Sequence, residues 1–209
     1  MVRDKVGIVM KVIGITGGVG AGKSFILDYL KNNYGAKLLI ADEIGHQVMK
    51  KGTTGYEMIL KAFTSKILDN QGEISRPILA EIIFSDLEKR EILNKIIHPL
   101  VKSYIQAEIE NFRKIEEIKL VVVEAALLIE DHYETICDEF WYIYTKNEIR
   151  KQRLKLSRGY SEEKIEAIFA SQASEEMFRK NCSVVIDNNL MPNEVYHQID
   201  LIMKNREES

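Results

Sequence analysis

The sequence has few cysteines, no long apolar run and no large excess of charge of either sign. Its two cysteines, Cys137 and Cys182, lack the spacing of a metal site or a redox motif, so we expect both to be reduced and structural. No apolar stretch approaches the ~20 residues of a membrane span. These absences exclude a disulfide-stapled secreted domain and a membrane-spanning protein, and they favour a soluble, cytoplasmic one.

Positive and negative side chains nearly balance, with 29 Lys and Arg against 32 Asp and Glu, a net charge of -3 and a pI near 5.9. Such a surface does not indicate nucleic-acid binding, so any positive site must be local. We therefore expect small-molecule substrates, with no nucleic acid, no membrane and no obligate protein partner.

The length of 209 residues allows one domain with a sizeable core, or a core domain that carries inserts. The sequence contains no internal repeat and no low-complexity tract. Its N-terminus lacks the shape of a signal peptide. Residues 1–9 precede a natural first strand, so we expect them to be dispensable, either as an extension or as the result of an early start codon.

The most informative stretch is Gly14-Ile-Thr-Gly-Gly-Val-Gly-Ala-Gly-Lys-Ser24, which fits a phosphate-binding loop. Its glycines allow successive backbone N–H groups to turn inward around phosphate oxygens. Lys23 brings a charge to the β- and γ-phosphates, and Ser24 offers a hydroxyl to Mg²⁺. The context fits, because residues 10–15 predict a buried strand and residues 25–33 a helix.

A second short apolar run, residues 36–42, predicts a buried strand that ends in Asp42. In open α/β sheets the carboxyl ends of the strands face the ligand crevice, so this carboxylate is expected near the phosphate-binding loop. Asp42 is then a candidate catalytic base, or else the N-cap of a helix that begins around Glu43.

Residues 45–115 show helical patterns and no strand pattern. Ser75-Arg-Pro predicts a helix start with Ser75 as the cap, whereas His98-Pro99 predicts an interruption of a helical run. Val101, Ile105, Ile109 and Phe112 then mark one buried stripe. An insert of about seventy residues is long for a crossover, which suggests a substrate-holding subdomain.

Residues 118–124 are rich in β-branched side chains and predict a strand buried on both faces. It ends in Glu124, which would face the Mg²⁺ side of the loop or cap a helix at residues 125–130. Residues 139–144 predict a further strand. The basic helix that follows, at residues 148–158, is either a solvated face or a cationic lid over the phosphates; Arg150, Arg153 and Arg158 are its arginines.

Two helical stretches at 161–170 and 174–179, a strand at 183–187 and a last helix complete the chain. Strands that alternate with helices predict an α/β fold of the P-loop NTPase type, with three layers and a five-stranded parallel sheet. We expect a single domain over residues 1–209, with its core at 10–44, 116–146 and 183–209, a helical insert at about 45–115 and a helical lid at about 147–182.

Beyond the loop, the chain resembles the dephospho-CoA kinases, P-loop enzymes that phosphorylate the ribose 3′-hydroxyl of dephospho-CoA with ATP in the last step of coenzyme A synthesis. The resemblance extends over nearly the whole chain from Met10. It is carried by the loop, Ala41-Asp42, Leu93-Asn-Lys-Ile-Ile-His-Pro99, Leu127-Leu-Ile-Glu130, Gln152-Arg-Leu154 with Arg158, Ala170-Ser-Gln172 and Val185-Ile-Asp-Asn188.

This resemblance implies catalytic roles for Asp42, Lys23 and Arg153, with Asp42 as base or orienter of the attacking hydroxyl. It implies that Asp42, Arg76 and His98 bind dephospho-CoA and that Ser24 and Glu124 hold Mg²⁺. The residues implied to bind ATP are Gly18, Val19, Gly20, Ala21, Gly22, Lys23, Ser24, Phe25, Arg158 and Asn188.

The chain departs from the family pattern at Phe25, where a Thr is usual, and at Glu124-Ala125-Ala126, where an Asp and a Pro usually precede Leu-Leu. Met177 and Cys182-Ser183 replace the usual Lys and Ala-Asp. A kinase for another nucleoside, nucleotide or small metabolite shares the loop, lid and sheet. A nucleotide-dependent switch is disfavoured. Asp69-Asn-Gln-Gly72 resembles the Asp-x-x-Gly segment of GTPases but follows no strong strand, and the sequence has no Asn-Lys-x-Asp segment of the kind that recognises guanine.

Overall fold

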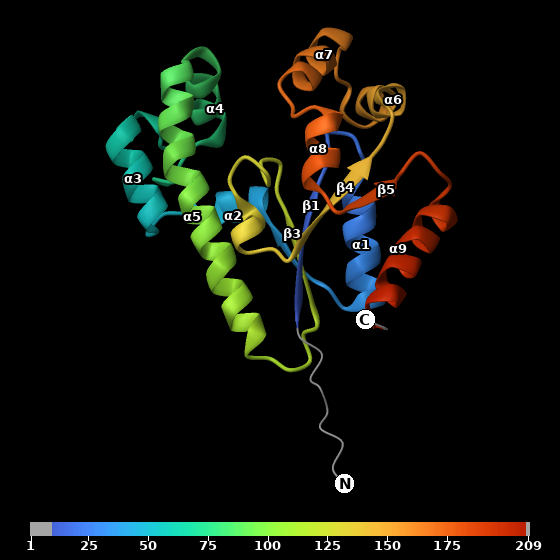
Figure 1. Cartoon of the computed structure of the whole chain (residues 1–209). Helices are drawn as coiled ribbons and strands as arrows, with labels where there is room; N and C mark the ends of the chain where they lie inside the picture. Colours follow the sequence, from blue (N-terminus) through green and yellow to red (C-terminus); the bar gives the residue numbers. More distant parts are fainter. Residues whose placement is uncertain (1–9, 208–209) are drawn as a thin grey trace. The chain divides into compact units, whose positions relative to one another are not determined.

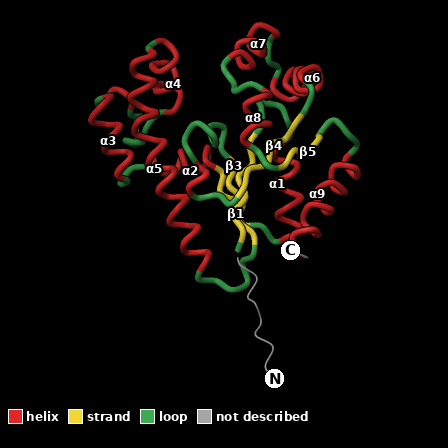
Figure 2. Tube along the Cα trace, in the orientation of Figure 1, coloured by secondary structure: helices red, strands yellow, loops and turns green. Residues whose placement is uncertain are grey.

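The computed structural model describes residues 10–207, so the expected extension at residues 1–9 lies outside the described residues. The chain divides into two compact units, one containing residues 39–114 and the other the remainder. Figure 1 gives the labels of the elements, and Figure 2 distinguishes helices, strands and loops by colour.

A five-stranded sheet with the order β2-β3-β1-β4-β5 carries the fold. β1 pairs in parallel with β3 and with β4, and β4 pairs in parallel with β5. This confirms the predicted α/β class, and the chain segments that follow β1, β3, β4 and β5 meet at one edge of the sheet. The strands are β1 (Lys11–Thr16), β2 (Lys37–Ile40), β3 (Leu120–Glu124), β4 (Glu139–Tyr144) and β5 (Val184–Asp187).

The central strands are apolar on both faces, as parallel strands between two helical layers require. Val121, Val122 and Val123 of β3 are fully buried, and so are Ile13 of β1 and Trp141 of β4. This core fixes the positions at which the strands end and the functional loops begin.

Among residues 10–207, five helices belong to the same unit as β1, β3, β4 and β5. α1 begins after Gly22 and ends at Gly35, both of which adopt the left-handed conformation that glycine favours. Ser161 and Ser174 cap the helices that follow them by accepting a backbone N–H hydrogen bond. The helices are α1 (Lys23–Tyr34), α6 (Asn147–Arg158), α7 (Glu162–Ala170), α8 (Glu175–Asn181) and α9 (Pro192–Glu207), with a short 3-10 turn η2 (Tyr133–Thr135).

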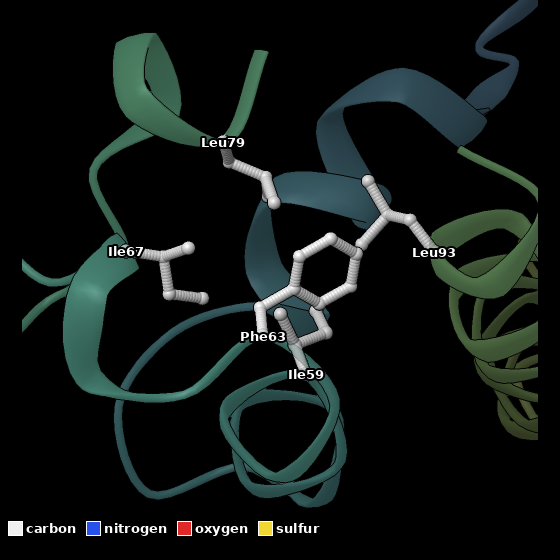
Figure 3. Packing of buried hydrophobic residues seen from close by; sticks show 5 residues of the cluster. All are labelled: Ile59, Phe63, Ile67, Leu79 and Leu93. Atoms are coloured by element: carbon white, nitrogen blue, oxygen red, sulfur yellow. The ribbon is translucent and has the colours of Figure 1, made fainter. Parts of the chain in front are cut away.

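The second unit is helical and has its own apolar core. Figure 3 shows this cluster, in which the Phe63 ring lies among four aliphatic side chains, Ile59, Ile67, Leu79 and Leu93. The elements that supply and surround it are α2 (Ala41–Val48), α3 (Thr54–Phe63), η1 (Ser65–Ile67), α4 (Arg76–Ser85) and α5 (Leu87–Arg113).

The prediction that His98-Pro99 interrupts a helical run is wrong. α5 continues through Pro99 to Arg113, with Val101, Ile105 and Ile109 buried along one face. Proline removes one N–H and strains the preceding turn, but tertiary packing of a long apolar stripe outweighs that local preference.

Three local predictions also need correction. The strand predicted at residues 36–42 ends at Ile40, and Ile40, not Asp42, is the N-cap of α2. Ser75 occupies the N-cap position of α4, but its side chain makes no capping hydrogen bond. Residues 126–130 form turns, so Glu124 caps no helix there. The insert also contains one isolated antiparallel bridge, between Leu68 and Ile74.

Candidate active site

The phosphate-binding loop connects the carboxyl end of β1 to α1, as the sequence predicts. Gly17, Gly20 and Gly22 have positive φ values of 149°, 82° and 84°. At Gly17 a Cβ would lie 2.7 Å from the carbonyl oxygen of Ile143 in β4, so the neighbouring strand also leaves room only for glycine. The loop therefore follows a path that few other sequences can adopt.

Two carbonyl groups of the loop are held from outside by side chains of distant elements. The Val19 oxygen accepts a hydrogen bond from Arg150 Nε at 2.9 Å. The Ala21 oxygen accepts three, from Asn188 Nδ2 at 2.7 Å, Thr145 Oγ1 at 3.0 Å and Arg153 Nη1 at 3.2 Å. All three donors to Ala21 come from the segments that follow β4 and β5.

These anchors determine where the loop amides point. In a planar trans peptide the C=O and the following N–H point in opposite directions. Holding the carbonyls of Val19 and Ala21 outward therefore turns the N–H groups of Gly20 and Gly22 to the other side. With the positive end of α1, this arrangement of N–H groups suits an anion.

Lys23, which directly follows Gly22, has its charge partly neutralised. Its Nζ donates to the Gly17 carbonyl oxygen at 2.9 Å and lies 3.3 Å from Oε1 of Glu124, at the end of β3. The side chains of Lys23 and Glu124 are only 17% and 14% exposed, so solvent screens the pair weakly. Lys23, which the sequence predicts at the phosphates, and Glu124, which it predicts at the metal, therefore form an ion pair.

The two residues expected to hold Mg²⁺, Ser24 and Glu124, are of the kind that a nucleotide-dependent magnesium site uses. Among residues 10–207, no group of three or more His, Cys, Asp or Glu side chains could form a complete protein-only cage. Mg²⁺ usually takes only one or two protein oxygens and completes its shell with phosphates and water. The two expected residues offer oxygens of this kind. Glu124 has its carboxylate beside Lys23, and Ser24 has its hydroxyl in the first turn of α1.

Phe25 points its ring toward α9. It stacks on Tyr196 with 4.9 Å between ring centroids, and Tyr196 stacks on Tyr29 at 3.9 Å. The Tyr29 and Tyr34 hydroxyls both donate to Asp200 Oδ1, at 2.7 Å and 2.6 Å. α1 and α9, which lie side by side in Figure 1, are therefore joined next to the loop by aromatic contacts that the sequence analysis did not predict.

Arg153, Arg158 and Asn188 differ in their relation to the loop. Arg153 donates through Nη2 to the Asn188 carbonyl oxygen at 3.1 Å as well as to Ala21, and Asn188 is buried. Arg158 is exposed at the end of α6, with its guanidinium 5.8 Å from the centre of the Tyr160 ring. Arg150, which was expected only as one of the arginines of the cationic lid, makes a direct contact with the loop.

The remaining expected residues belong to the helical unit. Asp42 is exposed in the first turn of α2, and Arg76 is the exposed first residue of α4. His98 is half-buried within α5. α2 packs closely on α5 at Gly45, where a Cβ would lie 3.9 Å from side-chain atoms of Ile97 and of Val101. Asp42 and His98 thus stand on two helices that pack together.

A parallel sheet whose central strand leads into a glycine-rich loop, with a lysine and a serine at the start of the next helix, defines a P-loop nucleotide-binding protein. A family model described as dephospho-CoA kinase matches residues 11–193. The chain belongs to the dephospho-CoA kinase family, whose members catalyse the ATP-dependent phosphorylation of dephospho-CoA, the final step of coenzyme A biosynthesis.

Individual proteins agree with this assignment. The dephospho-CoA kinase of Dehalococcoides mccartyi is 38% identical over 198 residues, which cover 94% of this chain and 98% of the relative. The solved structure of dephospho-CoA kinase from Campylobacter jejuni has a TM-score of 0.70 at 25% identity, over 94% of this chain and 97% of that one. A shikimate kinase from Acinetobacter baumannii shares the fold, with a TM-score of 0.55 at 17% identity, over 97% of this chain and 98% of that one.

These matches make the chain a nucleotide-binding, ATP-using kinase. None of the helices in the described part of the chain combines the length and the apolarity that a membrane span needs.

Proposed function

We propose that this chain, in the cytoplasm and without an obligate protein partner, transfers the γ-phosphoryl group of Mg·ATP to the ribose 3′-hydroxyl of dephospho-CoA. The observation that carries the proposal is the loop whose carbonyls are held outward beside the Lys23–Glu124 pair. Such a loop is preorganised for a polyphosphate, and phosphoryl transfer depends mostly on positioning and charge neutralisation.

In this mechanism the loop residues from Gly18 to Phe25 form the phosphate site, and the backbone N–H groups of Gly20 and Gly22 donate to the phosphate oxygens. Lys23 exchanges its contact with the Gly17 carbonyl for the β- and γ-phosphates. Ser24 and Glu124 would hold Mg²⁺, which supplies charge neutralisation at the phosphate oxygens. Arg153 adds positive charge next to Ala21, and Arg158 and Asn188 contribute to the nucleotide site.

The helical insert at about 45–115 is the proposed holder of dephospho-CoA. Arg76 and His98 bind its polar groups, and Asp42 orients the 3′-hydroxyl and accepts its proton as the O–P bond forms. The segment at about 147–182, which comprises α6, α7 and α8, acts as the lid over the phosphates.

The activity is tested by measuring ADP release with Mg·ATP and dephospho-CoA, with adenosine, AMP and other nucleosides as alternative acceptors. Turnover confined to dephospho-CoA is the expected result. Preferred turnover on another acceptor would instead favour a kinase for a nucleoside or another small metabolite, which shares the loop and the sheet.

The role of Asp42 is tested by Asp42→Asn, which keeps the shape of the side chain and removes the proton acceptor. We expect kcat to fall by about 10²–10⁴-fold with little change in ATP affinity, because the effect is confined to the attacking hydroxyl. Lys23→Ala is the contrasting variant, since it should abolish transfer through the phosphates. Near-normal turnover of Asp42→Asn would contradict the assignment.

A further inference from the structure

We infer that Arg150 is a positioning residue for nucleotide binding, which fixes the Val19 peptide and thereby aims the loop amides at the β-phosphate. The inference rests on the proposed function only in taking the loop as the nucleotide site. It assigns to Arg150 a role separate from those of Arg153 and Arg158, although all three arginines lie on α6.

Each nitrogen of the Arg150 guanidinium already has a partner within the protein. Nε donates to the Val19 oxygen at 2.9 Å, Nη1 to Asn147 Oδ1 at 3.1 Å and Nη2 to Gln172 Oε1 at 2.5 Å. The face of the group lies 4.1 Å from the centre of the Phe169 ring. The cation–π contact and the hydrogen bonds from all three nitrogens hold the guanidinium in one orientation, which lysine could not reproduce.

The guanidinium also lies directly against the loop. A Cβ built on Gly18 would be 2.2 Å from Nη2, so the absence of a side chain at Gly18 is what admits the arginine. The Arg150 backbone carbonyl comes within 3.1 Å of the corresponding position on Gly20. Burial lowers the pKa of Arg150, but the residue stays charged at any physiological pH. The loop is therefore in contact with a fixed positive charge from a residue that is distant in the sequence.

The consequence for binding concerns the Val19 peptide. If its carbonyl turned inward, a partial negative charge would face the phosphates and the Gly20 N–H would be lost to them. Arg150 prevents this rotation by a charge-assisted hydrogen bond. Since each nitrogen of the guanidinium already donates to a protein group, Arg150 acts through the loop, and its effect should be the same for ADP as for ATP.

The experiment measures ADP and ATP affinity by calorimetry for the full chain, without any acceptor, in the wild type and in Arg150→Met. We expect both affinities to fall by a similar factor, about tenfold to a hundredfold, as for the loss of a hydrogen bond to a charged group. Lys155→Met is the matched control, because Lys155 is a cation on the same helix whose ammonium group pairs with Glu162 of α7 at 2.6 Å. Its affinities should be unchanged.

Two further variants separate positioning from loss of folding. Gln172→Ala removes the support of Nη2 but leaves the bond to Val19, so it should lower both affinities by a smaller, equal factor. Guanidinium ion added to Arg150→Ala should restore part of the nucleotide affinity, whereas sodium at the same ionic strength should not. A merely structural role would not respond to the added ion.

The inference is overturned if Arg150→Met weakens ATP but not ADP, because Arg150 would then contact the γ-phosphate directly. Unchanged affinities for both nucleotides would overturn it too. If Arg150→Met does not fold, the equal loss of ADP and ATP affinity in Gln172→Ala decides the question. Because no acceptor is present, these outcomes are independent of whether the wild type phosphorylates dephospho-CoA or another alcohol.

Discussion

Gly22 is the position at which the geometry of the phosphate-binding loop is most sensitive to one added carbon. Its φ is +84°, and a Cβ there would lie 2.4 Å from Asn188 Nδ2 and 3.1 Å from Arg153 Nη1. The Asn188 amide cannot move away without lengthening its 2.7 Å hydrogen bond to the Ala21 oxygen. Gly22→Ala should therefore disturb both the backbone and the anchor of the loop.

The magnitude has two parts. A non-glycine residue in the left-handed region costs about 1–2 kcal/mol, and the loss of one neutral hydrogen bond about 0.5–1.5 kcal/mol. Gly35→Ala is the matched control, because Gly35 has a φ of +63° at the other end of α1, and a Cβ there would meet no atom of the described residues within 4 Å. The destabilisation of Gly35→Ala therefore contains only the backbone contribution.

The assay is thermal unfolding of the two variants, accompanied by ATP titration. We expect the melting temperature of Gly22→Ala to lie about 1–6 °C below that of Gly35→Ala, because the additional loss of about 0.5–1.5 kcal/mol shifts a chain of this length by about 2–4 °C per kcal/mol. ATP affinity should fall only in Gly22→Ala. Gly22→Ala should destabilise the Asn188→Ala variant less than it destabilises the wild type, since Asn188→Ala has already removed the clash and the hydrogen bond. Equal melting temperatures and equal ATP affinities in the two single variants would refute the reasoning.

The remaining predictions concern charge and burial. Glu124→Gln should raise the Mg²⁺ concentration needed for half-maximal turnover, measured by metal titration, and an unchanged requirement would remove Glu124 from the metal site. Burial raises the pKa of Cys182 to about 12, and Cys137 is also buried, so a thiol reagent at neutral pH should label both only after unfolding. Burial likewise raises the pKa of Tyr133 and Tyr142 from 10.0 to about 12. The unfolded chain deprotonates these tyrosines first, so their contribution to the free energy of unfolding is complete below about pH 10 and is lost as the pH rises to about 12. Alkaline denaturation followed by tyrosinate absorbance will check this.

The strands and the loop could be predicted because their signals are local. The β4 boundaries follow from a continuous run of aromatic and β-branched residues between two polar segments, and the structure places the strand at the predicted residues 139–144. The loop from Gly17 to Ser24 could likewise be predicted, because its glycines are the residues that adopt the positive φ angles it needs. Ser161 and Ser174 cap helices for the same local reason.

Predictions failed where distant packing competes with local preference. Pro99 signals a break, yet α5 continues because its buried face extends on both sides of the proline. Arg150 illustrates the corresponding limit for the site. Its position in a basic helix was visible, but its bond to Val19, 131 residues earlier, depends on how α6 lies beside the loop. No spacing rule within the sequence contains that information.

The departure at Phe25 shows how the chain can replace a polar residue beside the phosphates without loosening the loop. The Phe25 backbone N–H still bonds to the Gly22 carbonyl oxygen at 3.2 Å, so the first turn of α1 is intact. Its ring adds a stack on Tyr196, which in turn contacts Tyr29. Aromatic pairs of this kind contribute about 0.5–1.5 kcal/mol beyond the area they bury. Because this packing acts on the turn that carries Lys23 and Ser24, α9 stabilises the start of α1. Asn188 and Arg153 hold the preceding loop through their hydrogen bonds to the Ala21 carbonyl oxygen.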